Sequence, residues 1–283
     1  MFSLRRPIPA ILGLAATTIA LTAAALAPAH LASASVRTSS ASSPKPTVVI
    51  EAGAWADNSS FASVVRLLLE DGYTVDVPPN PLQGLTYDSQ TLAGFLATIS
   101  GPIVLVGHSY GGMVTTNAAA GNPDVKALVY VDAYIPAQGD TLQGLTGAQP
   151  GSCLAVAPAD VTNVFTFAPI PGAPAGDVDA YVKPTVFASC FANGLPAGEG
   201  AVLAATQRPL ATGTLTDPSG APAWTTIPSW AVVGTADHVI PPAEQLFMAT
   251  RARAHITEVD APHLSMVSNP GTVTQVILNA AHA

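Results

Sequence analysis

Charged residues are scarce in this sequence. Lysine, arginine, aspartate and glutamate together account for 10% of its 283 residues, and 10 basic residues stand against 18 acidic ones, which gives a formal net charge of −8 at pH 7. Because nucleic acids are bound through clustered positive charge, this balance excludes a nucleic acid as an expected partner. The 49% of hydrophobic residues likewise exclude a disordered chain of low hydrophobicity.

Cysteine is nearly absent as well. Cys153 and Cys190 are the only two, and neither stands in a Cys/His cluster with the spacing of metal ligands. The sequence therefore predicts no metal site, and no cofactor is expected. In an exported protein an even pair favours a disulfide, and the alternative is two buried thiols.

The first 34 residues have the pattern of a secretory signal peptide. Arg5 and Arg6 form a basic start, residues 8–27 are apolar and free of charge, and two small-x-small sites follow, Ala27-Pro28-Ala29 and Ala32-Ser33-Ala34. An apolar segment of about 20 residues is also long enough to remain as a membrane anchor. Because this one is rich in Ala and Thr and only weakly hydrophobic, we expect cleavage. The prediction is a secreted protein without a stable membrane anchor.

Behind the signal, residues 35–46 are rich in Ser and Pro and are predicted to form a disordered linker. The remaining residues, 47–283, suffice for one large domain. Short β-branched runs alternate there with longer helical patterns, which predicts an α/β fold with a mostly parallel central sheet and helices on both faces. The predicted strands are nearly continuous apolar runs, typical of strands buried on both faces: Thr47–Ile50, Thr74–Val77, Ile103–Val106, Ala127–Val131, Ser229–Val233 and His255–Val259. The predicted helices are Ser59–Asp71, Asp88–Ile99, Tyr110–Ala120, Pro242–Arg253 and Pro270–Ala280, with Asp88 and Asn269 as N-caps.

One stretch, residues 135–226, breaks this alternation. It is rich in Pro and Gly and contains both cysteines, Tyr181 and four of the eight phenylalanines. A plain loop of about 90 residues would be far longer than loops in compact domains are. We therefore predict an inserted cap that is partly helical and linked by a disulfide between Cys153 and Cys190.

The strongest chemical signal is the segment Gly107-His108-Ser109-Tyr110-Gly111, followed by Gly112. It comes directly after the apolar run 103–106 and directly before a helical pattern, which is the context of a G-x-S-x-G nucleophile elbow. Such a sharp turn lifts the serine hydroxyl clear of the sheet and points the helix N-terminus at the reaction centre. Ser109 is therefore the candidate nucleophile.

A serine hydroxyl is a weak nucleophile until a base takes its proton, so a histidine is needed. Among six histidines, His263 lies after the last predicted strand and before the last predicted helix, where a fold of this topology places its base. His108 belongs to the elbow and is expected to pack, and His238 adjoins a candidate acid. We predict His263 as the base.

A carboxylate must orient this imidazole and stabilise its charged form. Asp237 follows a predicted strand and precedes a helix, so the chain order is Ser…Asp…His, as this topology requires. Asp132, at the end of the run 127–131, is the alternative acid. Asp260 is too near His263 in sequence to orient it easily. Asp237 is favoured, and Asp132 stays open.

The tetrahedral intermediate of acyl transfer also needs two fixed donors for its oxyanion. One is expected to be the backbone N–H of Tyr110, which directly follows the nucleophile. The other is expected on the loop after the first strand, with Ala54 as the first choice and Trp55 as the next.

These residues resemble the α/β-hydrolases of the esterase and hydroxynitrile-lyase-like branch. The matching segments are Gly53-Ala-Trp-Ala-Asp57, Pro78-Pro-Asn-Pro-Leu82, Gly107-His-Ser-Tyr-Gly-Gly112, Gly234-Thr-Ala-Asp-His-Val-Ile-Pro241 and Asp260-Ala-Pro-His263. The resemblance extends from about residue 47 to residue 280, strong at the elbow and weak in the cap. It implies the α/β-hydrolase fold, a Ser-His-Asp triad and an oxyanion loop, whereas the substrate varies among such proteins.

Two departures from this branch bear on function. Ala52 stands where the family usually has a histidine that braces the oxyanion loop, and Glu51 is a candidate to replace it. Hydroxynitrile lyases of the branch carry a lysine close to the catalytic histidine, and the segment around His263 has none, which argues against cyanohydrin cleavage. The leading hypothesis is hydrolysis of a small-molecule carboxylic ester through an acyl-enzyme. Trp55, Phe165 and Phe187 are the candidate substrate-binding residues. The alternatives are a carbon–carbon lyase and a binding protein that retains the fold without turnover.

Overall fold

The structure, a computed structural model, describes residues 44–283. The predicted signal peptide and most of the predicted linker lie outside the described residues. Of the linker, only Pro44–Pro46 are described, and they precede the first strand without regular secondary structure.

A six-stranded sheet with the order β2-β1-β3-β4-β8-β9 forms the centre of the domain. Every neighbouring pair in it is parallel. The strands are β1 (Thr47–Glu51), β2 (Val75–Asp76), β3 (Ile103–His108), β4 (Val125–Val131), β8 (Ser229–Gly234) and β9 (His255–Val259). The four inner strands consist almost entirely of buried residues, as strands covered on both faces should. The predicted parallel sheet is thereby confirmed.

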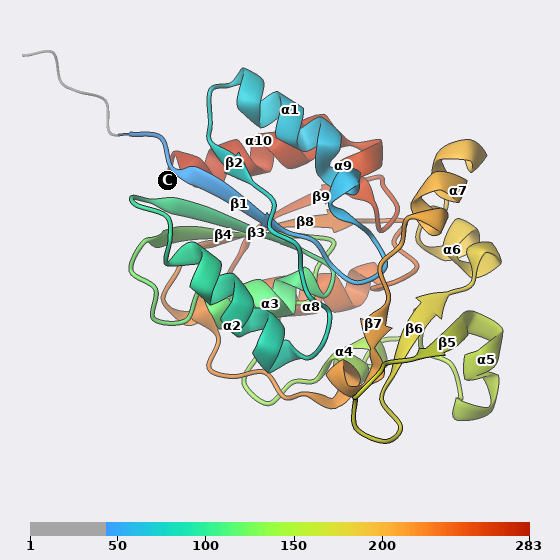
Figure 1. Cartoon of the computed structure of the whole chain (residues 1–283). Helices are drawn as coiled ribbons and strands as arrows, with labels where there is room; N and C mark the ends of the chain where they lie inside the picture. Colours follow the sequence, from blue (N-terminus) through green and yellow to red (C-terminus); the bar gives the residue numbers. More distant parts are fainter. Residues whose placement is uncertain (1–43) are drawn as a thin grey trace, which may run out of the picture. The chain divides into compact units, whose positions relative to one another are not determined.

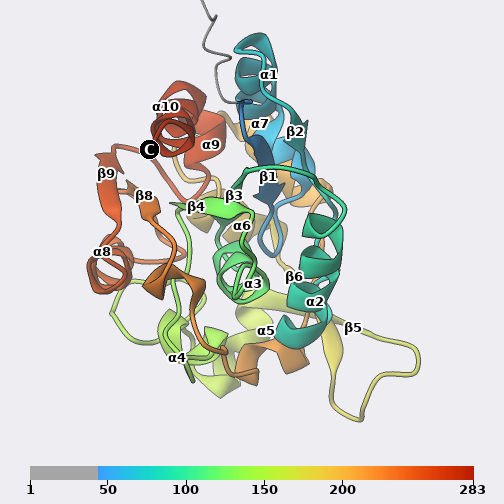
Figure 2. The ribbon, with the colours of Figure 1, turned by 90° about the vertical axis from the view of Figure 1, so that its left-hand side faces the viewer.

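Helices cover both faces of this sheet, as predicted. Figure 1 and Figure 2 show two helices on one face, α1 (Ala62–Glu70) and α10 (Pro270–Ala281), which contact one another. The short α9 (Ser265–Ser268) precedes α10 on the same side. The opposite face carries α2 (Leu85–Leu96), α3 (Gly111–Ala118) and α8 (Pro242–Arg251). Among the helices described, none combines the length and the apolar character needed to span a bilayer.

Three predicted elements differ from the structure in capping or burial. The helix α2 begins at Leu85, so Asp88 lies inside its first turn and is not its N-cap. The reason is a remote cap, because Asp217 Oδ2 accepts the Leu85 N–H at 2.8 Å. The strands β2 and β9 are predicted to be buried on both faces, but they form the two edges of the sheet. Both residues of β2 are partly exposed, and Ile256 of β9 is 38% exposed.

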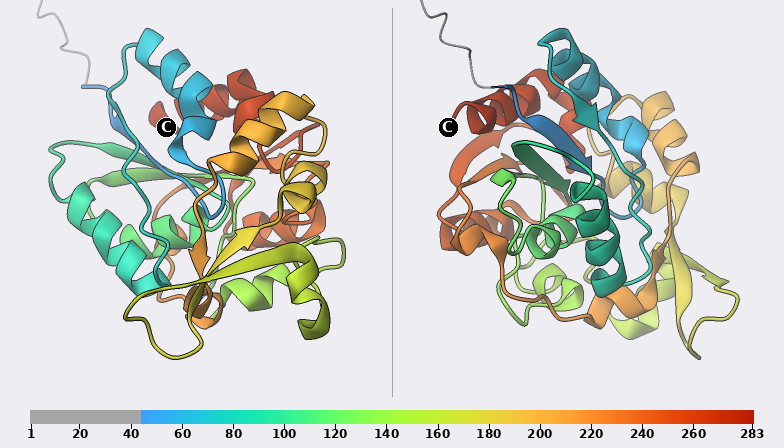
Figure 3. Two further views of the ribbon diagram at one scale, coloured as in Figure 1. Left: turned by 45° about the vertical axis from the view of Figure 1, so that its right-hand side comes forward. Right: turned by 60° about the vertical axis from the view of Figure 1, so that its left-hand side comes forward.

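The chain between β4 and β8 forms the cap beyond the carboxyl ends of the central strands (Figure 3). Its helices are α4 (Leu142–Thr146), α5 (Val161–Val164), α6 (Pro184–Cys190) and α7 (Ala197–Ala205). It also contains an antiparallel sheet of β5 (Phe165–Pro169), β6 (Val178–Val182) and β7 (Leu210–Ala211), which the sequence did not predict. The alternation of Val178, Ala180 and Val182 with polar or larger residues was the available signal, because strands bury every second side chain.

Candidate active site

Ser109 occupies the sharp turn between β3 and α3, with a backbone φ of +53°. This left-handed conformation is strained for a residue with a side chain. The turn is possible because glycines follow it. A Cβ on Gly111 would collide with the Glu51 carbonyl oxygen, and one on Gly112 would collide with that of Tyr134. The elbow is therefore pressed against the ends of β1 and β4, and Ser109 is only 2% exposed.

His263 and Asp237 meet Ser109 at the carboxyl ends of the strands. His263 Nε2 lies 3.0 Å from Ser109 Oγ, and His263 Nδ1 lies 2.8 Å from Asp237 Oδ2. The imidazole is fully buried, and so is the carboxylate. The three side chains form one chain of hydrogen bonds of the length that a nucleophile, its base and an orienting acid require.

The Asp237 carboxylate is held by three donors besides His263. Its Oδ1 accepts the backbone N–H groups of Val239 at 2.7 Å and Ile240 at 3.0 Å. Its Oδ2 accepts the Gln245 side-chain amide at 2.7 Å. Burial raises the pKa of Asp237, and these donated hydrogen bonds act in the opposite direction. Gln245 was missed in the sequence, where a glutamine inside a helix carries no distinctive signal.

Asp132, the alternative acid, hydrogen-bonds the two loops that carry Asp237 and His263. It is fully buried, its Oδ1 accepts the Gly234 N–H at 2.9 Å, and its Oδ2 accepts the Ser265 N–H at 3.0 Å. Gly234 ends β8 shortly before Asp237, and Ser265 follows His263 by two residues. Asp132 thus ties these loops together, while Asp237 contacts the imidazole.

Aromatic rings enclose His263. The His108 ring centroid lies 4.8 Å from that of His263 and the Phe191 centroid 5.3 Å, the latter in an edge-on arrangement. His108 Nε2 also lies 3.1 Å from the His263 carbonyl oxygen, in agreement with a packing role for His108. Burial lowers the pKa of the His263 imidazole from its ordinary 6.5 to about 3. The ring is therefore neutral at neutral pH and able to accept a proton.

The acid side of the activity profile should reflect this burial. Ser109 can pass its proton only to neutral His263, and activity is lost as pH falls through the histidine pKa. Since that pKa is lowered, the midpoint of the acid limb of kcat/KM should lie below pH 6.5, towards pH 3. Initial rates with p-nitrophenyl acetate from pH 3 to 8 measure it, with circular dichroism at each pH to verify that the protein stays folded. A midpoint at or above 6.5 in folded protein would contradict the lowered pKa of His263.

Neither the Ala54 N–H nor the Tyr110 N–H donates to a protein acceptor among the described residues. The Trp55 N–H is engaged, because it donates to the Arg208 carbonyl oxygen at 3.0 Å. Gly53, which directly precedes Ala54, packs so closely on the elbow that a Cβ there would lie 2.6 Å from Ser109 Cβ. This geometry favours Ala54 over Trp55 as the second donor to an oxyanion.

Asn80 braces the loop in which Ala52 replaces the usual histidine. Its side-chain amide donates to the Ala52 carbonyl oxygen at 2.9 Å, and it is fully buried. The sequence indicates Glu51 as the candidate for this role. It does not single out Asn80, although Asn80 belongs to one of the matching segments. Farther along the loop, the Trp55 indole N–H donates to the Ala180 carbonyl oxygen of the cap at 2.7 Å.

A cavity of about 660 Å³ opens over Ser109. Of the three candidate substrate-binding residues, Trp55 and Phe165 line it and Phe187 does not. Phe187 is fully buried inside the cap, where its ring stacks on that of Phe191 at 5.0 Å. The other lining residues are mostly apolar: Tyr110, Tyr134, Leu142, Gln143, Thr146, Gly147, Leu154, Ala155, Val156, Ala157, Pro158, Val161, Leu215 and Val239. Nowhere in residues 44–283 do three or more His, Cys, Asp or Glu side chains gather as a metal ion would need.

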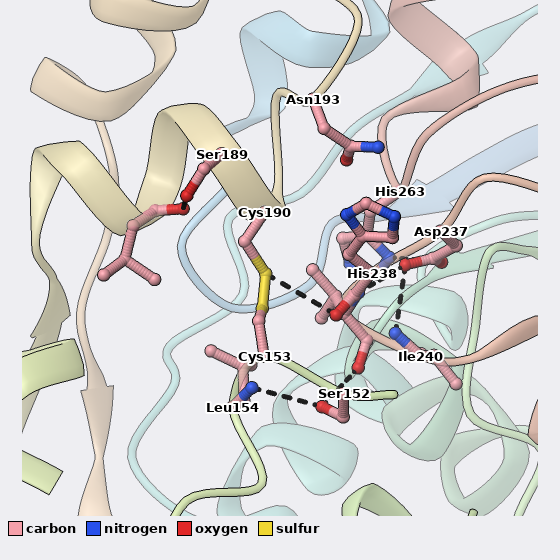
Figure 4. Close-up of a disulfide and its surroundings, with 12 residues drawn as sticks. Ser152, Cys153, Leu154, Ser189, Cys190, Asn193, Asp237, His238, Ile240 and His263 are labelled. Carbon is pink, nitrogen blue, oxygen red and sulfur yellow. Dashed lines mark hydrogen bonds and ion pairs between the residues drawn. A yellow bond between two sulfur atoms is a disulfide. The ribbon is translucent and has the colours of Figure 1, made fainter. Parts of the chain in front are cut away.

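A disulfide between Cys153 and Cys190 lies beside the loop of Asp237, as Figure 4 shows. The Cys153 N–H donates to the His238 carbonyl oxygen at 2.9 Å, and Cys190 Sγ lies 3.6 Å from the same oxygen. The Ser152 hydroxyl donates to the Val239 carbonyl oxygen at 2.7 Å. The disulfide therefore fixes one wall of the cavity against the residues that follow the candidate acid.

Reduction of this disulfide should destabilise the protein. The two cysteines are 37 residues apart, and closing a loop of that length stabilises a fold by roughly 4 kcal/mol. In a domain of this size the melting temperature should fall by about 10 °C in dithiothreitol, as followed by calorimetry. The double variant Cys153→Ser/Cys190→Ser should melt near the temperature of the reduced wild type, and its melting temperature should not change when dithiothreitol is added. Equal melting of oxidised and reduced wild type would refute the expectation.

The sequence profile described as "Alpha/beta hydrolase family" matches residues 48–276. A carbendazim hydrolyzing esterase from Nocardioides sp. (strain SG-4G) is 33% identical over 110 residues, which cover 34% of this chain and 46% of the relative. The match thus spans about half of that relative's length.

Solved structures share the architecture. Polyneuridine aldehyde esterase has a TM-score of 0.69 at 18% identity, with 83% of this chain and 99% of that chain covered. A pyrethroid hydrolase from Sphingobium faniae JZ-2 has a TM-score of 0.64 at 22% identity, with 84% and 98% covered. At these identities the similarity concerns the fold.

Proposed function

Because the chain belongs to the alpha/beta hydrolase family, we propose that it is a serine hydrolase that cleaves carboxylic esters through an acyl-enzyme. The observation that carries this proposal is the buried hydrogen-bonded chain from Ser109 through His263 to Asp237. A neutral histidine between a serine and a carboxylate is the arrangement that activates a hydroxyl for attack on a carbonyl carbon.

In this mechanism Ser109 Oγ attacks the ester carbonyl carbon while its proton passes to His263 Nε2. The carbonyl oxygen becomes an oxyanion and accepts hydrogen bonds from the Ala54 and Tyr110 N–H groups. His263 then gives its proton to the alcohol oxygen, the carbon–oxygen bond breaks, and the acyl group stays on Ser109. A water molecule then attacks the acyl carbon while its proton passes to His263 Nε2. His263 returns that proton to Ser109 Oγ, the bond between Ser109 and the acyl group breaks, and the carboxylic acid leaves. Asp237 stabilises the imidazolium each time it forms.

The cavity supports an uncharged substrate with a bulky apolar part. Within residues 44–283, no Lys, Arg, Asp or Glu side chain lines it. Two of its hydroxyls are already paired. The hydroxyl oxygens of Tyr134 and Thr146 lie 2.7 Å apart, and the Thr146 hydroxyl donates to the Leu142 carbonyl oxygen. An ionised group placed there would lose hydration without gaining a partner. The names of two similar proteins, a carbendazim hydrolyzing esterase and a pyrethroid hydrolase, agree with small-molecule substrates.

A matched pair of esters tests both parts of this proposal. p-Nitrophenyl hexanoate and the monoester of p-nitrophenol with glutaric acid have acyl chains of similar length, and only the second ends in a carboxylate. We expect kcat/KM to be at least about 100-fold higher for the hexanoate, because burying an unpaired carboxylate is costly. If the protein hydrolyses neither ester above its spontaneous rate, the esterase proposal is overturned. Equal rates overturn the proposed substrate class alone.

Secretion belongs to the same proposal. Its support is the pairing of Cys153 with Cys190, since disulfides persist in oxidising compartments outside the cytosol. The N-terminal pattern of residues 1–34 supplies the predicted export signal.

A further inference from the structure

The side chain that follows the nucleophile reaches a buried carboxylate on a different helix. Tyr110 is 1% exposed, and its hydroxyl donates to Asp88 Oδ2 at 2.7 Å. Asp88 lies in the first turn of α2 and is fully buried. Its second oxygen accepts the Gln83 N–H at 3.0 Å. The bond thus joins the start of α3 to α2, the neighbouring helix on that face of the sheet.

Breaking this bond would leave a buried carboxylate short of a donor. Such a loss costs more than the bond contributes when it is formed, because the carboxylate cannot turn to water instead. Burial raises the pKa of Asp88, and the Gln83 N–H and the Tyr110 hydroxyl lower it. The carboxylate therefore depends on the Tyr110 hydroxyl, and the Tyr110 side chain is confined to one orientation.

The same bond is one of two that flank the strained residue. On one side of Ser109, the His108 ring hydrogen-bonds the His263 carbonyl oxygen at 3.1 Å. On the other side, Tyr110 hydrogen-bonds Asp88. A backbone at φ +53° persists only where its neighbours over-determine it. These two anchors, on the residues directly before and after Ser109, meet that need.

We propose that Asp88 is a positioning residue, which through the Tyr110 hydroxyl holds the Tyr110 backbone N–H in the orientation that an oxyanion requires. This inference rests on the proposed function. The anchor acts on the transition state because the oxyanion forms only there, whereas the ground-state ester needs no such alignment.

The test uses Tyr110→Phe, which keeps the ring and removes the hydroxyl. We expect kcat to fall about tenfold with KM within about twofold. The affinity for a trifluoromethyl ketone should fall by the same factor. In that inhibitor Ser109 Oγ adds to the ketone carbon, its proton passes to His263, and the ketone oxygen becomes the oxyanion.

Tyr130→Phe is the matched control. Tyr130, on β4, is 1% exposed. Its hydroxyl lies 2.8 Å from Oγ1 of Thr116, which belongs to helix α3. This variant removes a comparable buried hydrogen bond that involves none of Ser109, Tyr110 and Asp88, so stability should fall while kcat and ketone affinity stay unchanged. If Tyr110→Phe behaves like Tyr130→Phe, with lower stability and unchanged kcat and ketone affinity, the inference is wrong.

Asp88→Leu tests the same anchor from its other end. It should match Tyr110→Phe in kcat and ketone affinity, and the double variant should lose no more than either single one, because both remove one interaction. Fully additive losses would overturn the inference. An inactive wild type that does not bind the ketone would overturn the proposed function itself, a different result from active wild type with unaffected variants.

Discussion

Replacing Ser109 by alanine is expected to lower kcat for ester hydrolysis by about 10⁶-fold. In the part of the chain that the structure describes, no other hydroxyl hydrogen-bonds His263 Nε2, so the variant has no group there to form the acyl-enzyme. Because the triad acts as a unit, Ser109→Ala/His263→Ala should be no slower than Ser109→Ala alone. Long incubations with p-nitrophenyl acetate, at high concentrations of protein prepared in a host without esterase background, measure the residual rates.

Covalent labelling provides the control for this result. A fluorophosphonate should add one phosphonyl group to the wild type and none to Ser109→Ala, as seen by mass spectrometry of the intact chain and of the peptide that contains Ser109. Fluoride leaves as the serine oxygen bonds to phosphorus. Wild-type protein that stays unlabelled, or that carries the label on another residue, rules out Ser109 as the nucleophile.

The second large effect is expected for Asp237→Asn, with kcat lowered by about 10⁴-fold. The structure indicates why so small a change is so damaging. The Val239 and Ile240 N–H groups both point at Oδ1, so the asparagine oxygen must take that place. Its NH₂ group then faces His263 Nδ1, where Asp237 Oδ2 now lies at 2.8 Å. The histidine proton is driven onto Nε2, which can no longer accept the proton of Ser109.

Asp132→Asn separates the two candidate acids. Each Asp132 oxygen accepts one backbone N–H, from Gly234 and from Ser265, and an amide can replace only one of the two oxygens. We therefore expect a lower melting temperature and a fall in kcat of less than about 100-fold. The comparison is made at a temperature at which both variants are folded. A larger loss of kcat in Asp132→Asn than in Asp237→Asn would reverse the assignment.

The parallel sheet and the elbow at Ser109 could be predicted because their signals are local, whereas the candidates His263 and Asp237 follow from the order of strands, loops and helices along the chain. The buried strands show as apolar runs, and the elbow requires glycines within a few residues of the serine. These constraints act on neighbouring positions, so a sequence displays them directly.

What escaped prediction depends on contacts between distant segments. The start of α2 is capped by Asp217, which lies 132 residues farther along the chain. Asn80 braces a loop that lies 28 residues earlier in the chain. Phe187 packs inside the cap, although a phenylalanine would suit a binding site equally well. The cap sheet has strands of five, five and two residues, too short for a clear period.

The division between cap and central sheet has a consequence for how such a protein can change over generations. The side chains of the proposed chemistry stand at the ends of central strands, whereas most of the cavity wall comes from residues 142–165. Substitutions in that wall can alter which molecules fit without moving a reacting atom. Descendants of such a protein can therefore acquire new substrates through substitutions in the cap, while the central sheet and the side chains of the proposed reaction stay the same.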